Sequence, residues 1–140
     1  MKYSDKVDHL NKGECLFCRD DSTDFVLEND LAFVLWDNFP VSPSHCLVIP
    51  KRHVETYFDM NAQEHEASKE LLFKMRDKIQ RDDPSVKGFN IGANCGPYAG
   101  QTIFHCHLHL IPRRKDDIPN PVGGVRNIFP GSGPYCVLAD

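Results

Sequence analysis

Three histidines occupy alternate positions in the segment His-Cys-His-Leu-His-Leu-Ile, residues 105–111. Side chains of a β-strand point alternately to its two faces, so this spacing predicts a strand over residues 101–111 with the three imidazoles on one face. The neighbouring apolar residues should enter the core from the other face: Phe104, Cys106, Leu108 and Leu110. The chain must therefore build a sheet that carries histidines on one side.

Further apolar segments predict that this sheet is antiparallel. The polar pair Asn29-Asp30 separates two of them and suggests a hairpin. Strands are expected at residues 25–28, 31–37, 46–49 and 88–93. Because only one long helix interrupts them, too few crossover connections exist for parallel pairing, and the fold class is α+β.

A long amphipathic helix is predicted to follow Asn61. This residue can cap the helix, with Glu64 as its reciprocal partner. Apolar residues recur at helical spacing and should face the core: Ala67, Leu71, Leu72, Met75 and Ile79. The helix must end before Asp83-Pro84, since the residue before a proline disfavours helical geometry.

The length of 140 residues fits one domain with its own core. We expect residues 1–118 to form this domain, and residues 119–140, rich in proline and glycine, to form an irregular tail packed on it. A net charge of −4 gives no support for nucleic-acid binding. We expect no membrane association and a cytoplasmic location, because the sequence shows neither a membrane-length apolar run nor a signal-peptide core.

Three kinds of chemistry are compatible with the histidine face. It can be a solvated polar surface, a metal site built from all three imidazoles, or a catalytic surface. An uncharged imidazole, with a pKa of ~6.5, is a good nucleophile near neutral pH. The preceding loop, Asn-Cys-Gly-Pro-Tyr-Ala-Gly-Gln-Thr, is compatible with a phosphate cradle, because its glycines admit a bulky anion and its amides can donate hydrogen bonds. Its candidate residues are Asn94, Gly100, Gln101 and Thr102.

A Cys-x-x-C pair, Cys15 and Cys18, stands near the beginning of the chain. A redox dithiol normally lies in a βαβ setting, which this sequence does not suggest. A structural zinc site needs two further ligands, and spacing alone leaves several candidates open: His45, His53, His105, Cys46 and Cys95.

Taken together, these motifs resemble the histidine triad (HIT) superfamily of nucleotide hydrolases and transferases. The segment 105–111 matches the family signature, and the segments 31–37, 40–53 and 94–102 are similar to its other characteristic blocks. The resemblance implies a HIT fold, a five-stranded antiparallel sheet with two helices. It also implies a homodimer in which two sheets join into one of ten strands.

By the same resemblance, His107 is the nucleophile that attacks the α-phosphorus, flanked by His45 and His109. His109 contacts phosphate oxygens and the leaving group. Asp37 corresponds to the ribose-binding position, and Trp36, with Phe33 and Phe17, is a candidate for the base pocket. The residues implied to bind the phosphates are Asn94, Gly100, Gln101 and Thr102.

The Cys-x-x-C pair is similar to that of the zinc-bearing branch of the family. Carried over, the ligands of a structural zinc ion are Cys15, Cys18, His53 and His105. The three histidines of the triad would then have three different roles.

The resemblance is strongest to dinucleoside polyphosphate hydrolases of the fragile-histidine-triad type. It implies hydrolysis of a substrate such as diadenosine tetraphosphate through a covalent nucleotidyl-histidine intermediate. A nucleoside phosphoramidase is the first alternative, favoured by Asp37 and Asn94, and a non-catalytic nucleotide-binding protein is the second. Phosphorolysis is a variant of the same chemistry. Arg126, in the tail, is a candidate for contacting a distal phosphate.

Overall fold

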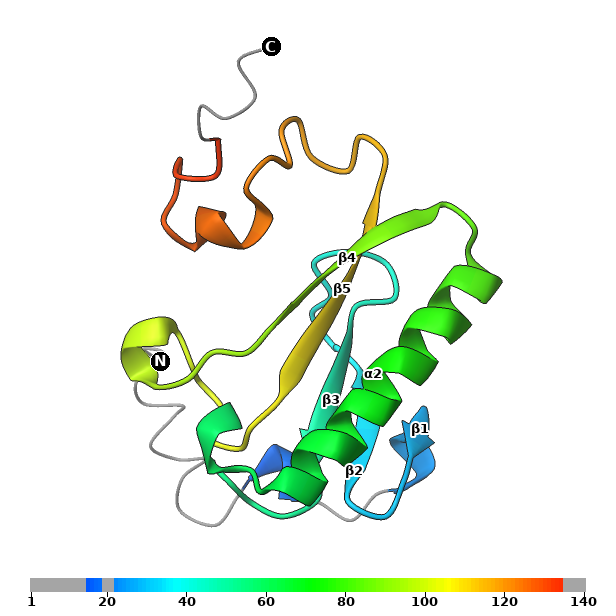
Figure 1. Cartoon of the computed structure of the whole chain (residues 1–140), viewed down its shortest axis with the longest axis vertical. Coiled ribbons are helices and arrows are strands. Elements are labelled where there is room, and N and C mark those ends of the chain that lie inside the picture. Colours follow the sequence, from blue (N-terminus) through cyan, green and yellow to red (C-terminus); the bar gives the residue numbers. More distant parts are fainter. Residues whose placement is uncertain (1–14, 19–21, 135–140) are drawn as a thin grey trace.

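The computed structural model describes residues 15–18 and 22–134. A five-stranded antiparallel sheet with the order β1-β2-β3-β5-β4 forms its centre. The strands are β1 (Leu27–Glu28), β2 (Ala32–Trp36), β3 (Cys46–Pro50), β4 (Val86–Gly92) and β5 (Leu108–Arg114). One long helix, α2 (Ala62–Asp82), crosses one face of the sheet (Figure 1). The α+β class and the antiparallel sheet predicted from the sequence are confirmed.

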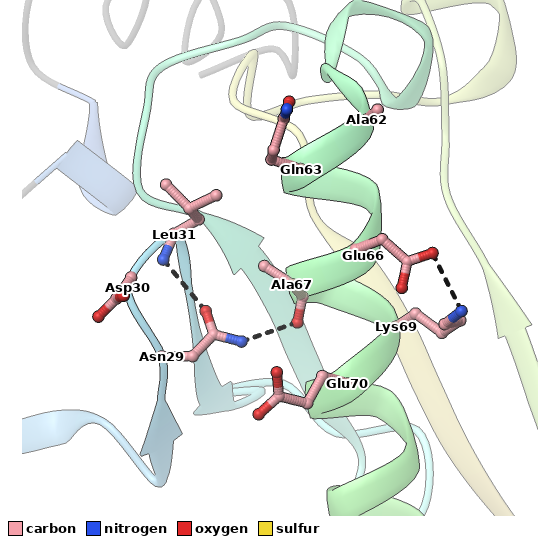
Figure 2. Close-up of a pocket in the computed structure, with 9 residues that line it drawn as sticks. All are labelled: Asn29, Asp30, Leu31, Ala62, Gln63, Glu66, Ala67, Lys69 and Glu70. Carbon is pink, nitrogen blue, oxygen red and sulfur yellow. Dashed lines mark hydrogen bonds and ion pairs between the residues drawn. The ribbon is translucent and has the colours of Figure 1, made fainter.

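Asn29 fixes the turn between β1 and β2 and joins it to the helix. Its Oδ1 accepts hydrogen bonds from the backbone N–H groups of Leu31 and Ala32, at 3.1 and 2.9 Å. Its Nδ2 donates to the carbonyl of Ala67 in α2, at 2.9 Å (Figure 2). The amide thus supplies an Asx turn and a tether at once, and the predicted hairpin is held against α2.

Helix α2 begins at the predicted reciprocal cap. Asn61 Oδ1 accepts the N–H of Glu64 at 2.8 Å, and Glu64 Oε1 accepts the N–H of Asn61 at 2.9 Å. Glu64 Oε1 also pairs with Arg52 Nη2 at 2.6 Å, and this hydrogen bond lowers the pKa of the buried carboxyl below its usual value. The cap therefore anchors the loop that follows β3, where His53 lies.

The core is divided between the two faces of the sheet. On the α2 side, the apolar stripe of the helix packs on alternate residues of the strands: Leu71, Met75, Ile79, Ala32, Val34, Cys46, Val48, Leu108 and Leu110. On the other side lies a smaller cluster: Cys15, Phe17, Phe33, Leu47 and Ile49. His109 pairs with Leu47 in the β3–β5 register, so its side chain belongs to this second face.

Strand β5 begins at Leu108, and the predicted start at residue 101 was wrong. The segment before it does not pair with a strand through its backbone, and it bonds chiefly to the loop after β3. The N–H of Cys106 donates to the carbonyl of Val54 at 2.7 Å, and Gln101 Nε2 donates to the carbonyl of Glu55 at 2.6 Å. His105 and His107 therefore precede the strand. The expected inward direction of Cys106, Leu108 and Leu110 is confirmed, since all three are buried, whereas Phe104 is only half-buried and belongs to no core cluster.

Besides α2, the helical segments within the described ranges are short 3₁₀ turns, and the second helix implied by the resemblance is not confirmed. They are η1 (Leu16–Cys18), η2 (Ser22–Asp24), η3 (Tyr57–Asp59), η4 (Pro97–Ala99) and η5 (Gly124–Ile128). Within residues 15–18 and 22–134, no helix is both long enough and apolar enough to cross a membrane.

The described part of the tail, residues 119–134, contacts strand β4 through η5 (Figure 1). Asn127 Oδ1 accepts the N–H of Gly133 at 2.8 Å, so the segment folds back on itself. Gly123 has a φ of 86°, and an added Cβ would collide with the carbonyl of Gly133. The division into a domain 1–118 and a tail 119–140 stays a prediction, and the outer ends of both regions lie outside the described residues.

Candidate functional site: a metal cluster beside a row of imidazoles

Four histidine rings and the ring of Phe17 lie next to one another on the sheet face opposite α2. The ring centroids of His45 and His109 are 5.1 Å apart, and those of His109 and His107 are 5.3 Å apart. Phe17 of η1 contacts both His107, at 5.2 Å, and His105, at 5.9 Å. The structure therefore brings His45, His107 and His109 into one row, and His105 lies at its end behind the ring of Phe17.

Four side chains with sulfur or nitrogen ligand atoms, His105 among them, come together at the end of this row. The ligand atoms of Cys15, Cys18, His53 and His105 all lie within 4.8 Å of one another. Cys18 Sγ is 3.1 Å from His53 Nδ1, and His105 Nδ1 is 3.4 Å from the sulfurs of both cysteines. Tetrahedral zinc with ordinary bond lengths would place sulfur and nitrogen roughly 3.5 Å apart. The residues thus fit a structural Cys₂His₂ site in both chemistry and spacing.

The hydrogen bond of His105 leaves the correct nitrogen for a metal. Its Nε2 lies 2.7 Å from the carbonyl of Pro50, which can only accept, so Nε2 carries the proton. The lone pair on Nδ1 therefore faces the two cysteines. Burial lowers the pKa of His105 to about 4, which keeps the ring uncharged, as a ligand must be.

To bind a metal, the Cys18 thiol has to lose its proton. Burial, together with the neighbouring Cys15, raises the pKa of Cys18 to about 11. A bound dication reverses this balance, because its charge stabilises the thiolate form. The placement of the pair among two imidazoles favours a metal over a redox dithiol.

We expect the purified protein to contain one zinc ion per chain, and Cys18→Ala to lose it. The variant should melt at a lower temperature, because structural zinc contributes directly to folding. Elemental analysis and a thermal melt are the measurements. Cys95→Ala, which changes a cysteine outside the cluster, is the matched control and should retain the metal. Equal zinc contents in Cys18→Ala and the wild type would contradict the assignment.

A second group of side chains that could bind a metal differs from the first in where its ring protons lie. Asp37 Oδ2, His45 Nε2 and His109 Nδ1 lie together, with 2.9 Å between the two nitrogens. His45 Nδ1 accepts the N–H of Val41 at 3.1 Å, so the proton of the neutral ring lies on Nε2. That nitrogen has no lone pair for a metal. The group is therefore a hydrogen-bonded pair of imidazoles beside a carboxylate, and it fits a metal poorly.

His107 has the tautomer that a nucleophile needs. Its Nδ1 donates to the carbonyl of His105 at 2.8 Å, which leaves the lone pair on Nε2. Burial lowers its pKa below the ordinary value, so the ring is uncharged at neutral pH. The lone pair is available because the metal cluster uses His105 and not His107.

Burial also lowers the pKa of His45, and it lowers the pKa of His109 to about 4. The neighbouring rings of His107 and His45 disfavour a charge on His109, and the carboxylate of Asp37 offsets this only in part. The whole row is therefore neutral near pH 7.

This neutrality predicts an acid-sensitive fold. Between pH 6.5 and about 4, the unfolded chain binds a proton at His109 that the folded chain does not bind, so stability falls as pH falls. From pH 7.5 to pH 5, the wild type should lose roughly 1–2 kcal/mol more unfolding free energy than His109→Asn. Urea denaturation at the two pH values, at equal zinc content, is the measurement. Identical losses would show that His109 titrates normally in the fold.

The glycine-bearing loop before β5 is organised by Gln101. Its Oε1 accepts the N–H of Gly96 at 2.8 Å, and its Nε2 donates to the carbonyls of Glu55 and Ile103. Gly100 has a φ of 90°, which favours glycine at this turn. Gln101 is 4% exposed and both of its amide protons are used, so it holds the loop and presents no free donor to a phosphate.

The remaining predicted nucleotide-binding residues differ in their exposure to solvent. Asn94 is exposed and Thr102 is half-buried, on either side of η4. Trp36 ends β2 and is 43% exposed, while Phe17 and Phe33 are buried in the second core cluster. Of these aromatic residues, only Trp36 offers a substantially exposed ring. It pairs with Cys46 and alternates with Leu35, so it belongs to the α2 face of the sheet and not to the face of His109.

Backbone groups that organise these residues escaped the sequence analysis. The N–H of Val41 and the carbonyl of Pro50 each fix a histidine tautomer, and no residue type is diagnostic for such groups. Phe17, predicted for the base pocket, contacts both His105 and His107. A groove of about 700 Å³ between the β1–β2 turn and α2 is lined by no histidine (Figure 2).

Comparison with known proteins decides the family. The HIT domain family matches residues 19–116. This chain belongs to the HIT family. An uncharacterized HIT-like protein of Borreliella burgdorferi is 35% identical over 109 residues, which span 74% of this chain and 78% of that protein. Adenylylsulfatase HINT3 of Arabidopsis thaliana is 34% identical over 116 residues, which span 76% of this chain and 55% of the plant protein.

Solved HIT structures share the fold. A HIT family protein from Bacillus anthracis has a TM-score of 0.68 and 33% identity, with 75% of this chain and 77% of that chain covered. A Zn-bound histidine triad family protein from Mycobacterium smegmatis has a TM-score of 0.66 and 31% identity, with 74% of this chain and 77% of that chain covered. Both support the antiparallel sheet described above.

Proposed function

We propose that this HIT protein is a nucleotide hydrolase that cleaves dinucleoside polyphosphates, such as diadenosine tetraphosphate, at the α-phosphorus. The observation that carries the proposal is the state of His107. Its ring is uncharged, its Nδ1–H is held by the carbonyl of His105, and its Nε2 lone pair is free. A neutral nucleophile meets no charge repulsion from an anionic phosphate.

The reaction proceeds in two displacements. Nε2 of His107 forms a bond to the α-phosphorus while the bond from phosphorus to the bridging oxygen breaks, and the departing polyphosphate takes up a proton from solvent. Water then attacks the phosphorus and the P–N bond breaks, which releases the nucleoside monophosphate and restores His107. The electrons of each broken bond stay with its leaving group.

The neighbouring residues bind and orient the reacting group. His45 donates through Nε2 to His109 Nδ1, so the proton of the neutral His109 ring lies on its Nε2, from which it can donate to a phosphate oxygen. Asn94 and Thr102 are proposed donors from the loop. A zinc ion held by Cys15, Cys18, His53 and His105 would supply structural charge and cross-linking only.

Nucleoside phosphoramidase activity is a second candidate, because the arginines at the end of β5 and in the tail are bound within the chain. Arg113 binds Asp117 at 2.7 and 2.9 Å, and Arg114 binds Asp83 at 2.8 Å. Arg126 donates to the carbonyl of Ser132. These arginines are engaged within the chain, which weakens the argument that they attract additional phosphates.

The test is product analysis by chromatography with diadenosine tetraphosphate, adenosine phosphoramidate and adenylyl sulfate in separate reactions. The last substrate is included because of the similarity to the plant adenylylsulfatase. We expect AMP and ATP from the dinucleotide, and a rate reduced by roughly 10³-fold or more in His107→Ala. His65→Ala, a histidine of α2 outside the row, is the matched control and should retain full activity.

Cleavage of only adenosine phosphoramidate, or only adenylyl sulfate, would show that the same residues catalyse a different hydrolysis. If the wild type cleaves none of the three substrates but binds them, the non-catalytic nucleotide-binding alternative replaces the enzyme. Phosphate added to the assay distinguishes phosphorolysis, which would yield ADP in place of AMP.

We also propose that two copies join through β4 into a ten-stranded sheet. The support is that β4 is the edge strand, pairs only with β5 among the described strands, and carries Ile91 with 54% of its surface exposed. Ile91→Lys should convert a dimer to a monomer in light scattering coupled to gel filtration. Phe58→Lys, at an exposed residue of η3, is the control. A wild type that is monomeric at high concentration would refute the dimer.

A further inference from the structure

Glu64 is a buried carboxylate that the proposed reaction does not use. Within residues 15–18 and 22–134 it is the only acidic residue that is buried, and its side chain is 3% exposed. Arg52 donates to it twice, from Nη2 to Oε1 at 2.6 Å and from Nε to Oε2 at 3.2 Å. Such a bidentate pair fixes the direction of the guanidinium as well as its distance. The pair therefore joins α2 to the residue directly before His53.

The loop between β3 and η3 holds His53 by few other bonds. The N–H of Lys51 donates at 2.8 Å at the start of the loop, and the carbonyl of Val54 accepts at 2.7 Å further along. Between these two points, Arg52 and His53 make no backbone hydrogen bond within the described ranges. The side chain of Arg52 is therefore the tether of this stretch to the rest of the fold.

The ring of His53 also lacks the support that the ring of His105 has. His105 Nε2 is held by the carbonyl of Pro50 at 2.7 Å. His53 is exposed, and its Nδ1 lies 3.1 Å from Cys18 Sγ, whereas its Nε2 has no hydrogen-bond partner among the described residues. A histidine ligand is normally oriented through its second nitrogen. The place of His53 in the cluster thus depends on the backbone that carries it, and so on Arg52.

We propose that the Arg52–Glu64 ion pair positions His53 as a metal ligand and so sets part of the metal affinity of the cluster. Neither residue belongs to the four that converge on the cluster, so both act through His53. Glu64 has a second effect, because its negative charge compensates the guanidinium near a site for a dication. The inference concerns metal binding and goes beyond the proposed nucleotide hydrolysis.

The first experiment measures zinc affinity in the full-length chain at 25 °C, by competition with a chromophoric chelator. We expect Arg52→Gln to bind zinc about 10- to 100-fold more weakly than the wild type, the range for loss of a group that orients a ligand. Glu64→Gln, which keeps an oxygen for the helix cap but not the charge, should change the affinity in the same direction. Arg52→Lys should recover part of it, because lysine keeps the charge without the two parallel bonds.

A control separates this role from a general loss of stability. Asn61→Ala removes the other side-chain contact of the same helix cap and leaves the Arg52–Glu64 pair in place. It should lower the melting temperature and change the zinc affinity by less than about threefold, because nearly all chains stay folded at 25 °C.

A double-mutant cycle decides whether Arg52 acts through His53. In a His53→Ala background, zinc is left with Cys15, Cys18 and His105, and the tether of residue 53 no longer matters. Arg52→Gln should then change the zinc affinity by less than about threefold, far below its effect in the wild type.

Equal zinc affinities of Arg52→Gln and the wild type would overturn the inference. The same loss in the His53→Ala background would also overturn it, since Arg52 would then act elsewhere. A wild type that binds no zinc would overturn the inference together with the metal assignment, and the result with nucleotides has no part in this test. If Arg52→Gln does not fold, Arg52→Lys and Glu64→Gln decide by the same comparisons.

Discussion

The hydrogen bond from His105 to the carbonyl of Pro50 is the constraint on which the functional face depends. It turns Nδ1 of His105 toward Cys15 and Cys18 and so assembles the ligand cluster from η1, the loop after β3 and the segment before β5. The carbonyl of His105 in turn holds His107 Nδ1. One buried imidazole therefore joins the candidate metal ligands to the proposed nucleophile, so an ion bound there would support the proposed reaction without contacting the substrate.

Backbone groups decide the proton position on three of these imidazoles. A carbonyl that faces a ring nitrogen places a proton there, as for His105 and His107, whereas the N–H of Val41 removes it from Nδ1 of His45. His109 inherits its tautomer from His45. Burial keeps all of these rings neutral near pH 7, so each has one donor and one acceptor nitrogen. The hydrogen bond from His45 to His109 therefore has a fixed direction.

Much of the fold was accessible from local patterns. The cap at Asn61, the turn at Asn29 and the apolar stripe of α2 depend on interactions between near neighbours in the chain, and all were confirmed. The start of β5 was wrong because residues 101–107 bond to the distant loop at Val54 and Glu55, and periodicity does not report such bonds. Gln101 was assigned to the phosphates from its place in the glycine-bearing loop and from the family resemblance, although the fold uses its amide internally.

The sequence by itself determined the residue types and their local order: alternating histidines, a cysteine pair and a glycine-bearing loop, enough to indicate a HIT protein. It also determined which side chains are apolar and therefore which face of each element is buried. Only the tertiary structure decided which nitrogen of each imidazole carries a proton and that Asp37 faces His45 and His109. Those features depend on single backbone groups brought from elsewhere in the chain, whose positions follow from packing and not from residue type.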